Sequence, residues 1–143
     1  MNNDMHSNMK QVASVVPATI GANATKTGVI VDRQGYGGVE FIASYGSVTT
    51  TGTICTLVLK EGDVTGTMTS IADADLLGTE ALASLLAGAR VAGIGKEVAK
   101  RVGYIGQKRY VQALVVQTGV TSVGGVSVTA CLCNPNVAPV SNP

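Results

Sequence analysis

The sequence predicts an all-β protein, an antiparallel β-sandwich or small barrel with one short helical insertion. Apolar and polar residues alternate along three stretches, at residues 39–45, 53–60 and 110–117. A period of two is typical of strands that bury one face. Turns rich in Gly and Thr separate about seven or eight such strands, and the strand–helix–strand pattern of a parallel sheet does not occur.

Six stretches are expected to form the main strands. In chain order they cover residues 27–32, 39–45, 53–60, 98–105, 110–117 and 126–133. A glycine-rich turn follows the first of them, and a tight corner containing Gly106 joins the fourth to the fifth. The apolar segment 12–16 is expected to end at Pro17, because proline lacks a backbone donor for the ladder.

One helix is expected between these strands. Thr79 can act as its N-cap, and Gly88 can end it. Leu82, Leu85 and Leu86 would then share one face at helical spacing. The sequence therefore predicts a short helical insertion that packs through its leucines.

The chain of 143 residues fits one domain with two appendages. Residues 1–11 are expected as an extended N-terminal arm, 12–133 as the sandwich and 134–143 as an irregular, proline-containing tail. An arm of ten residues can reach roughly 33 Å when it is extended. It is therefore long enough to contact a neighbouring molecule.

The composition points away from several classes of function. The formal net charge is +1, which argues against a protein that grips nucleic acid or anionic lipid. No apolar run approaches the length of a membrane span. Charged residues make up only 13% of the chain, and so sparse a charge is typical of a surface that is partly covered in an assembly.

Neither a metal nor a cofactor is expected. The cysteines are Cys55, Cys131 and Cys133, an odd number that does not describe a disulfide framework. Cys131 and Cys133 would point to the same side of a strand, too rigidly placed to bridge each other. The only histidine, His6, lies in the polar arm and completes no ligand set.

Catalytic motifs fail at their determining positions. The run Gly93-Ile94-Gly95-Lys96 resembles a phosphate-binding loop, but Arg90 and Glu97 stand where such a loop needs Gly and Ser or Thr. A histidine in the arm offers no base for Ser-His-Asp or Cys-His catalysis. We therefore expect a protein that is not an enzyme.

Basic residues cluster around the corner at Gly106. The cluster consists of Lys96, Lys100, Arg101, Lys108 and Arg109, with Glu97 as the one acid among them. It is either a solvated strand face or a docking edge for an acidic partner, in which Arg109 could pair bidentately. Tyrosines beside it would add rigid contact area. Together with the arm, the candidate partner contacts are Met5, Met9, Lys10, Tyr104, Lys108, Arg109 and Tyr110.

Several segments, in order and spacing, resemble a family of small virion structural proteins of tailed bacteriophages. The matching segments are Asp32 with Gly35-Tyr36 and Val39-Glu40-Phe41-Ile42-Ala43-Ser44; Ile71-Ala72-Asp73-Ala74-Asp75-Leu76-Leu77-Gly78; Val102-Gly103-Tyr104-Ile105-Gly106 with Lys108-Arg109-Tyr110-Val111; and Asn134-Pro135-Asn136-Val137-Ala138-Pro139-Val140. Relatives often carry a Gly-His-Pro-like segment near the end, where this chain has Cys133-Asn134-Pro135. No role for an imidazole is therefore carried over.

The resemblance implies a capsid decoration, or cement, protein on the outer surface of the phage head. It implies a jelly-roll-like sandwich that binds the major capsid protein as a dimer or trimer, without nucleic acid or membrane. A head–tail connector or tail component is the alternative within the virion. A carbohydrate-binding or adhesin module is the alternative from another class, although the absence of Trp and the single Phe disfavour it.

Overall fold

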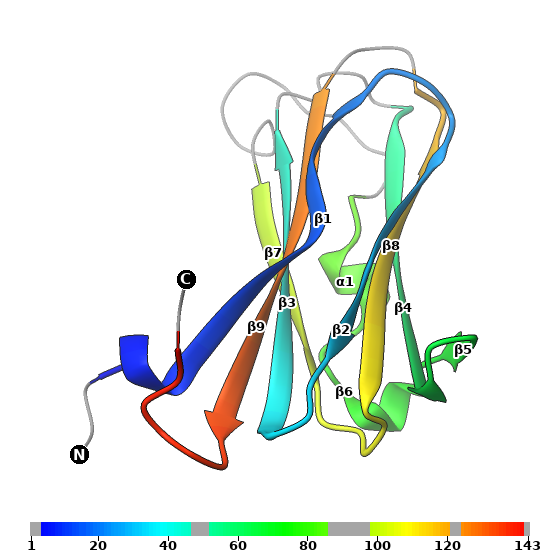
Figure 1. Cartoon of the computed structure of the whole chain (residues 1–143). Coiled ribbons are helices and arrows are strands. Elements are labelled where there is room, and N and C mark those ends of the chain that lie inside the picture. Colours follow the sequence, from blue (N-terminus) through cyan, green and yellow to red (C-terminus); the bar gives the residue numbers. More distant parts are fainter. Residues whose placement is uncertain (1–3, 47–51, 86–97, 121–123, 142–143) are drawn as a thin grey trace.

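Two antiparallel sheets face each other as a sandwich (Figure 1), which confirms the predicted all-β class. The structure, a computed structural model, describes residues 4–46, 52–85, 98–120 and 124–141. Its elements in chain order are η1 (His6–Asn8), β1 (Met9–Ile20), β2 (Thr25–Asp32), β3 (Tyr36–Gly46), β4 (Ile54–Val64), β5 (Thr67–Ser70), η2 (Asp73–Asp75), β6 (Leu76–Leu77), α1 (Glu80–Ala83), β7 (Val98–Tyr104), β8 (Tyr110–Thr118) and β9 (Gly124–Pro135).

The strands form nested antiparallel pairs, in which strands early in the chain pair with strands late in the chain. β1 pairs with β9, β2 with β8, β3 with β7 and β4 with β5, all antiparallel. Pairing of β3 with β9 and of β4 with β8 joins them into sheets of order β1-β9-β3-β7-β6 and β2-β8-β4-β5. Such nested pairs, shared between two facing sheets, make a jelly roll. The predicted jelly-roll-like sandwich is confirmed.

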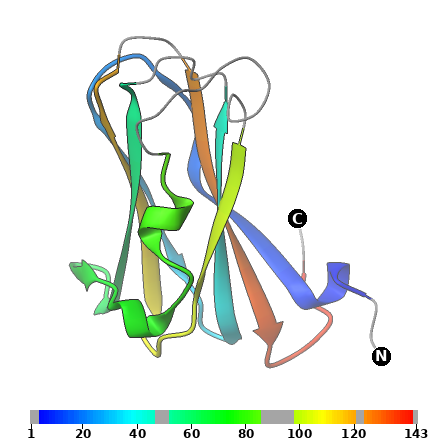
Figure 2. The same ribbon diagram turned by 180° about the vertical axis from the view of Figure 1, so that it is seen from behind.

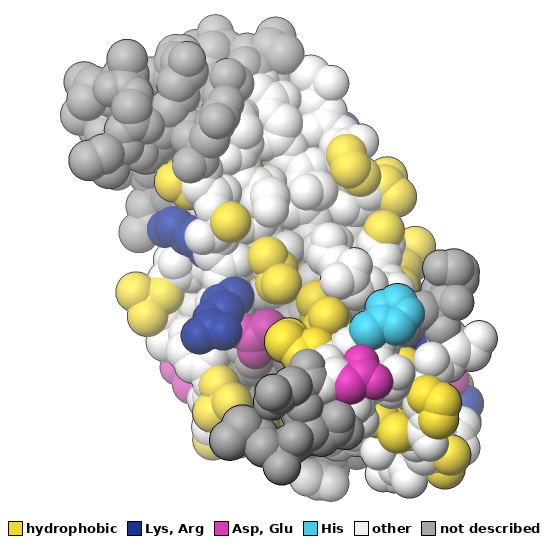
Figure 3. Space-filling view, turned by 90° about the vertical axis from the view of Figure 1, so that its left-hand side faces the viewer, with side chains coloured by type: hydrophobic (Ala, Val, Ile, Leu, Met, Phe, Trp, Pro, Cys, Tyr) yellow, Lys and Arg dark blue, Asp and Glu magenta, His cyan; other side chains and the backbone are white. Residues whose placement is uncertain are grey.

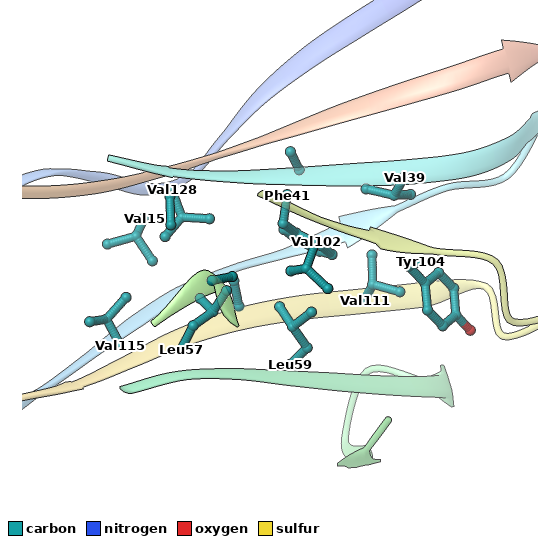
Figure 4. Packing of buried hydrophobic residues seen from close by; sticks show 14 of the residues in the cluster. Val15, Val39, Phe41, Leu57, Leu59, Val102, Tyr104, Val111, Val115 and Val128 are labelled. Atoms are coloured by element: carbon teal, nitrogen blue, oxygen red, sulfur yellow. The ribbon is translucent and has the colours of Figure 1, made fainter. Parts of the chain in front are cut away.

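The core lies between the two sheets and follows from the alternation in the sequence. Every second residue is buried in β8, in β3 from Val39 onward and in β4 up to Leu59, as the predicted strands at residues 39–45, 53–60 and 110–117 require. In Figure 4, Phe41 and Val102 of one sheet point toward Leu57, Leu59 and Val111 of the other. All of these side chains are fully buried, and each burial of this size contributes about 1.5–3 kcal/mol.

β1 continues three residues past Pro17, so the strand end predicted there is wrong. Proline is tolerated because β1 is the edge strand of its sheet. The register of β1 against β9 also shifts between Ala13 and Val15 and between Val15 and Ala18, where bulges release ladder hydrogen bonds.

One open side of the sandwich closes where β1 meets β2. Gly28 of β2 lies so near the neighbouring backbone that a Cβ would stand 2.5 Å from the carbonyl oxygen of Ala113 and 2.8 Å from that of Ser14. Only glycine allows this approach, which brings the edges of the two sheets together.

The helical insertion is shorter than predicted. Thr79 caps it, with Oγ1 accepting from the N–H of Leu82 at 3.1 Å, but α1 ends at Ala83. Leu82 is 70% exposed, whereas Leu85 is buried, so the predicted shared face of leucines is wrong. The other residues of that prediction, Leu86 and Gly88, lie outside the described residues.

The helix ends early because residues 80–85 cover the edge of β4. The backbone N–H groups of Cys55, Leu57 and Leu59 all donate to this segment. Their acceptors are, in that order, the carbonyl of Leu85, Oγ of Ser84 and the carboxylate of Glu80. The hydroxyl of Tyr45 in the facing sheet donates to Ala83 O at 2.9 Å. Figure 2 shows α1 between β4 and β7, where it closes the second open side.

The boundaries of the sandwich differ from those predicted. β1 begins at Met9, which pairs with Cys133, so residues 9–11 belong to the sandwich rather than to the arm. β9 runs to Pro135, which pairs with Tyr36. Asn134 and Pro135, the first two residues of the predicted tail, therefore belong to β9.

Candidate partner-binding surfaces

Arg33 organises the corner, residues 105–109, between β7 and β8. Its side chain lies in the turn between β2 and β3 and is almost fully buried. The guanidinium donates to the carbonyl oxygens of Lys108 at 2.6 Å, Gly106 at 2.6 Å and Tyr36 at 2.9 Å. Three carbonyl dipoles thus satisfy a buried cation, and the corner is held in one conformation.

Tyr104 lies beneath the corner and is only 1% exposed. Its hydroxyl donates to the carboxylate of Glu61 and accepts from the backbone N–H of Lys108 at 3.0 Å. Burial raises the pKa of the Tyr104 phenol, and the hydrogen bond to Glu61 adds to that rise. The prediction that Tyr104 offers surface to a partner is therefore wrong, because its ring is part of the core.

Lys108 and Arg109 are both paired within the chain. Lys108 Nζ lies 2.6 Å from Asp63 Oδ2, and Arg109 donates to the two carboxylate oxygens of Asp32 at 3.0 and 2.6 Å. These hydrogen bonds lower the pKa of Asp63 and of Asp32 below the ordinary value of 3.8. Arg109 therefore forms the expected bidentate pair with Asp32 of its own chain, not with a partner protein.

Two other residues of the predicted basic cluster, Arg101 and Lys100, also contact groups of the same chain. Arg101 Nε lies 3.7 Å from Glu40 Oε1, and Lys100 Nζ donates to Ser84 O at 2.7 Å. Lys96 and Glu97, the other members of that region, lie outside the described residues. Glu97 is the one acid among these residues in the sequence, but in the fold Asp32, Asp63 and Glu40 come from other strands and face the cluster.

Tyr110 is half-buried at the start of β8, beside the corner. The guanidinium carbon of Arg109 lies 5.0 Å from the centroid of its ring, a cation–π contact. Arg109 and Tyr110 thus form one exposed stack that a partner could touch, but with its charge already balanced by Asp32.

The N-terminal candidates lie beside the C-terminal tail. Met5 is 71% exposed ahead of η1, and Ser7 N donates to Asp4 Oδ1 at 3.0 Å. The tail returns to this segment, with Val140 N donating to Ser7 O at 2.9 Å. Both ends of the chain therefore leave the sandwich on the same side (Figure 1).

Met9 and Lys10 are strand residues rather than arm residues. Met9 lines a groove of about 490 Å³ together with Met5 and Cys133. Lys10 is half-buried opposite Leu132 and lines a groove of about 420 Å³ between β1 and β2. The structure thus brings Met5 and Met9 together and leaves Lys10 on the inner side of β1.

The outer face of the β1-β9-β3-β7 sheet carries little charge. Figure 3 shows this side of the molecule, with few charged side chains among neutral ones. A shallow trough of about 670 Å³ crosses its upper half, lined mainly by small residues such as Ser44, Ala99, Gly125 and Ser127. Small side chains leave the sheet flat enough for another protein surface to approach closely.

Burial disfavours the thiolate form of Cys131 and Cys133. Cys131 is buried and Cys133 half-buried on the same side of β9, as predicted. Burial raises the pKa of both thiols, and the nearby Glu40 carboxylate adds to it, so neither is activated as a thiolate. Within the described ranges, no group of three acidic, His or Cys side chains could hold a metal ion.

Arg33 is the organising residue that the sequence reasoning missed. It stands 73 and 75 positions from two of its acceptors, in a turn remote from the basic cluster. A single signal was present: Arg33 follows a strand and precedes a Gly-containing turn, a place where a long side chain can reach back across the end of a sandwich.

Comparison with protein-family models and with curated proteins found no match for this chain. Across the part of the chain that the structure describes, no helix has the length and hydropathy needed to cross a membrane.

Proposed function

We propose that this chain is a bacteriophage capsid decoration protein that binds the outer surface of the head shell and stabilises it. The observation that carries the proposal is a jelly-roll sandwich in which the exposed charges of the described residues are largely paired within the chain and the two ends emerge together on one side. Jelly rolls recur in viral capsid domains, in lectins and in cupins. The sequence resemblance favours the first of these.

The chemistry of the described residues supports a structural role. A cupin would need metal ligands inside the sandwich, and that space is filled with apolar side chains such as Phe41 and Leu57. A lectin usually offers exposed aromatic platforms, and here Tyr45 and Tyr104 are buried while Tyr36 and Tyr110 are half-buried. A rigid, sparsely charged body with exposed ends fits a protein that binds many equivalent sites on a shell.

Two parts of the surface are suited to the major capsid protein. Met5 and Val137 are 71% and 79% exposed near the N- and C-terminal ends, and each would bury apolar area only against a partner. Once one end is bound, the other contacts act at high effective concentration. Several weak contacts then add up to a stable attachment across shell subunits.

The proposal is tested on phage heads that lack this chain. Heads with and without it are heated, or transferred to low salt, and genome release is followed by dye fluorescence. We expect heads without the chain to release the genome at lower temperature, and addition of purified protein to restore the wild-type value. Equal release temperatures, with the chain present on the wild-type heads, would contradict a stabilising role.

A further inference from the structure

Lys10 is a half-buried lysine near the start of β1, opposite Leu132 of β9. Among the described residues it has no ion pair and no side-chain hydrogen bond. Five other basic residues do contact acceptors within the chain, namely Arg33, Lys100, Arg101, Lys108 and Arg109. Lys10 can therefore offer its three ammonium hydrogens to an acceptor from another molecule.

Two grooves meet at Lys10. The first, of about 420 Å³, lies between β1 and β2, and its apolar walls include Val12 and Leu132. The second, of about 370 Å³, lies between the turn after β2 and residues 135–141 of the tail, with Val140 in its wall. Lys10 and Tyr36 line both grooves, so one cation stands where two largely apolar depressions adjoin.

The first groove is bounded by two strand edges. β1 and β2 are the outermost strands of their sheets, and in the described part of the chain they do not pair with each other. Figure 1 shows them spreading apart toward the lower end of the sandwich. Every second residue of an edge strand directs its N–H and C=O groups away from the sheet. An extended peptide can therefore form backbone hydrogen bonds to such an edge while its side chains enter the groove.

We propose that these two grooves receive an extended segment of the major capsid protein, with one Asp or Glu carboxylate of that segment bound to Lys10. This inference rests on the proposed function and adds to it the position and the chemistry of one contact with the shell. The grooves lie beside the chain ends, because the tail that lines the second groove binds Ser7 through Val140.

The charges around Lys10 favour a single carboxylate. Asp32 also lines the first groove, but Arg109 already binds both of its carboxylate oxygens, so Asp32 does not neutralise Lys10. A charged hydrogen bond between apolar walls is stronger than one in open water, because the surroundings screen it less. Among the described residues that line the two grooves, Lys10 is the one cation. A nucleic-acid backbone would need several cations in a row.

Binding of the purified full chain to bare heads, measured as copies bound against free concentration, tests the contact. Lys10→Met keeps the length of the side chain without its charge and should raise the dissociation constant about tenfold or more. Lys10→Arg keeps the charge and should retain most of the binding. Lys26→Met is the matched control, because Lys26 is also a half-buried lysine on an edge strand but lines neither groove. Melting of each free variant shows that it is folded.

Carbodiimide cross-linking of decorated heads gives a second readout, because it joins an amine to a carboxylate that is in contact with it. We expect an amide between Lys10 and an Asp or Glu of the major capsid protein. Replacing that acid by Asn or Gln should weaken binding of the wild-type chain about as much as Lys10→Met does. It should weaken binding of the Lys10→Met chain no further, because the two groups act as one pair.

Heads that bind Lys10→Met as tightly as the wild-type chain would overturn the inference and leave the decoration role intact. Cross-links to the shell that involve other lysines but never Lys10 would do the same, as would equal losses for Lys10→Met and Lys26→Met. A wild-type chain that binds no heads would overturn both the inference and the proposed function, so the two failures are distinguishable.

Discussion

The guanidinium carbon of Arg33 lies 5.4 Å from the centroid of the Tyr104 ring, at the end of the sandwich where β7 turns into β8. The same guanidinium holds three carbonyl oxygens, and the Tyr104 hydroxyl binds Glu61 of the opposite sheet. Gly106 completes the contact, because a Cβ there would stand 2.5 Å from the Tyr104 ring. The geometry of this end thus depends on one cation and one ring. The basic residues of the corner therefore serve the fold of this end before they could serve binding.

Arg33→Lys should destabilise the fold by about 2–4 kcal/mol. A single ammonium keeps the charge but cannot reach three carbonyl oxygens that lie around a planar fork, so some of them stay buried without a donor. The measurement is the free energy of unfolding in urea. Arg101→Lys is the control, because the Arg101 side chain is 80% exposed and its loss should change little. Equal effects of the two substitutions would show that the Arg33 hydrogen bonds do not hold the corner.

Asp32 and Asp63 should make the fold sensitive to acid. Hydrogen bonds from Arg109 and Lys108 lower the pKa values of Asp32 and Asp63. The two carboxylates therefore contribute to the free energy of unfolding above the ordinary pKa of 3.8, and this contribution is lost as the pH falls through the lowered pKa values. The double variant Asp32→Asn, Asp63→Asn should therefore show a flatter stability curve below about pH 4. Both pairs are exposed, so the difference at neutral pH should be small and should shrink further in salt. Identical acid curves for the two proteins would contradict this.

Glu80→Gln should stabilise the fold at neutral pH. Burial raises the pKa of Glu80, Asp73 adds to the rise, and the hydrogen bond from Leu59 N opposes it. Because its pKa is raised in the folded state, Glu80 contributes most to the free energy of unfolding below the ordinary pKa of 4.5. That contribution is lost as the pH rises through the higher pKa of the folded state. Glutamine keeps an oxygen for Leu59 N without a charge to bury.

The check is the difference in unfolding free energy between the wild type and Glu80→Gln as a function of pH. This difference should be largest at neutral pH and should close as the pH falls below 4.5. Glu80→Ala removes the acceptor altogether and should destabilise at every pH. A glutamine variant that is less stable at neutral pH would mean that the charged hydrogen bond outweighs the cost of burial.

Gln117→Leu should stabilise the fold by about 1–2 kcal/mol. Gln117 is 2% exposed, and among the described residues neither its Oε1 nor its Nε2 has a hydrogen-bond partner. Leucine fills a similar volume without a polar group to desolvate. Gln112→Leu is the matched control on the same strand, because Gln112 Nε2 donates to Gly28 O at 2.8 Å and its removal should destabilise. Urea midpoints that fall in both variants would refute the assignment for Gln117.

The fold could be predicted because its signals are local. The alternation around Phe41, Leu57 and Val115 fixes which side of each strand is buried, whatever strand lies beside it. Pro17 misled the prediction because its effect depends on whether β1 is an edge or a central strand. The helix at Thr79 was predicted too long because backbone pairing of Leu85 with β4 overrides helical propensity.

The corner could be predicted only in part because its partners are distant in the sequence. Lys108 and Arg109 were recognised as exposed basic residues, but Asp63 and Asp32 lie 45 and 77 positions away. A strand pattern also cannot show that Tyr104 points inward at the end of the sandwich, where Glu61 receives its hydroxyl. Asp32 and Asp63 reach the two basic side chains only because β2 and β4 both pair with β8 in the jelly roll.

Deletion of residues 1–6 should leave the melting temperature nearly unchanged while weakening attachment to heads. The cut spares Ser7, which binds the tail through its carbonyl, and Met9, which begins β1. Met5 is exposed and adds little to the core. Calorimetry of the free chain and binding to heads separate the two effects. Saturation of bare heads by the shortened and full chains at equal concentrations would mean that this segment makes no contact.

The central claim is that the chain decorates the outside of a phage head, and counting its copies on heads tests that claim most directly. Purified chain is added to bare heads of the phage that encodes it, and the particles are reconstructed by electron cryomicroscopy. A decoration protein is expected as ordered sandwich density at equivalent positions all over the outer shell, with the two chain ends against the capsid. Density confined to one vertex would assign it to the connector or tail, and heads without added density would contradict the claim.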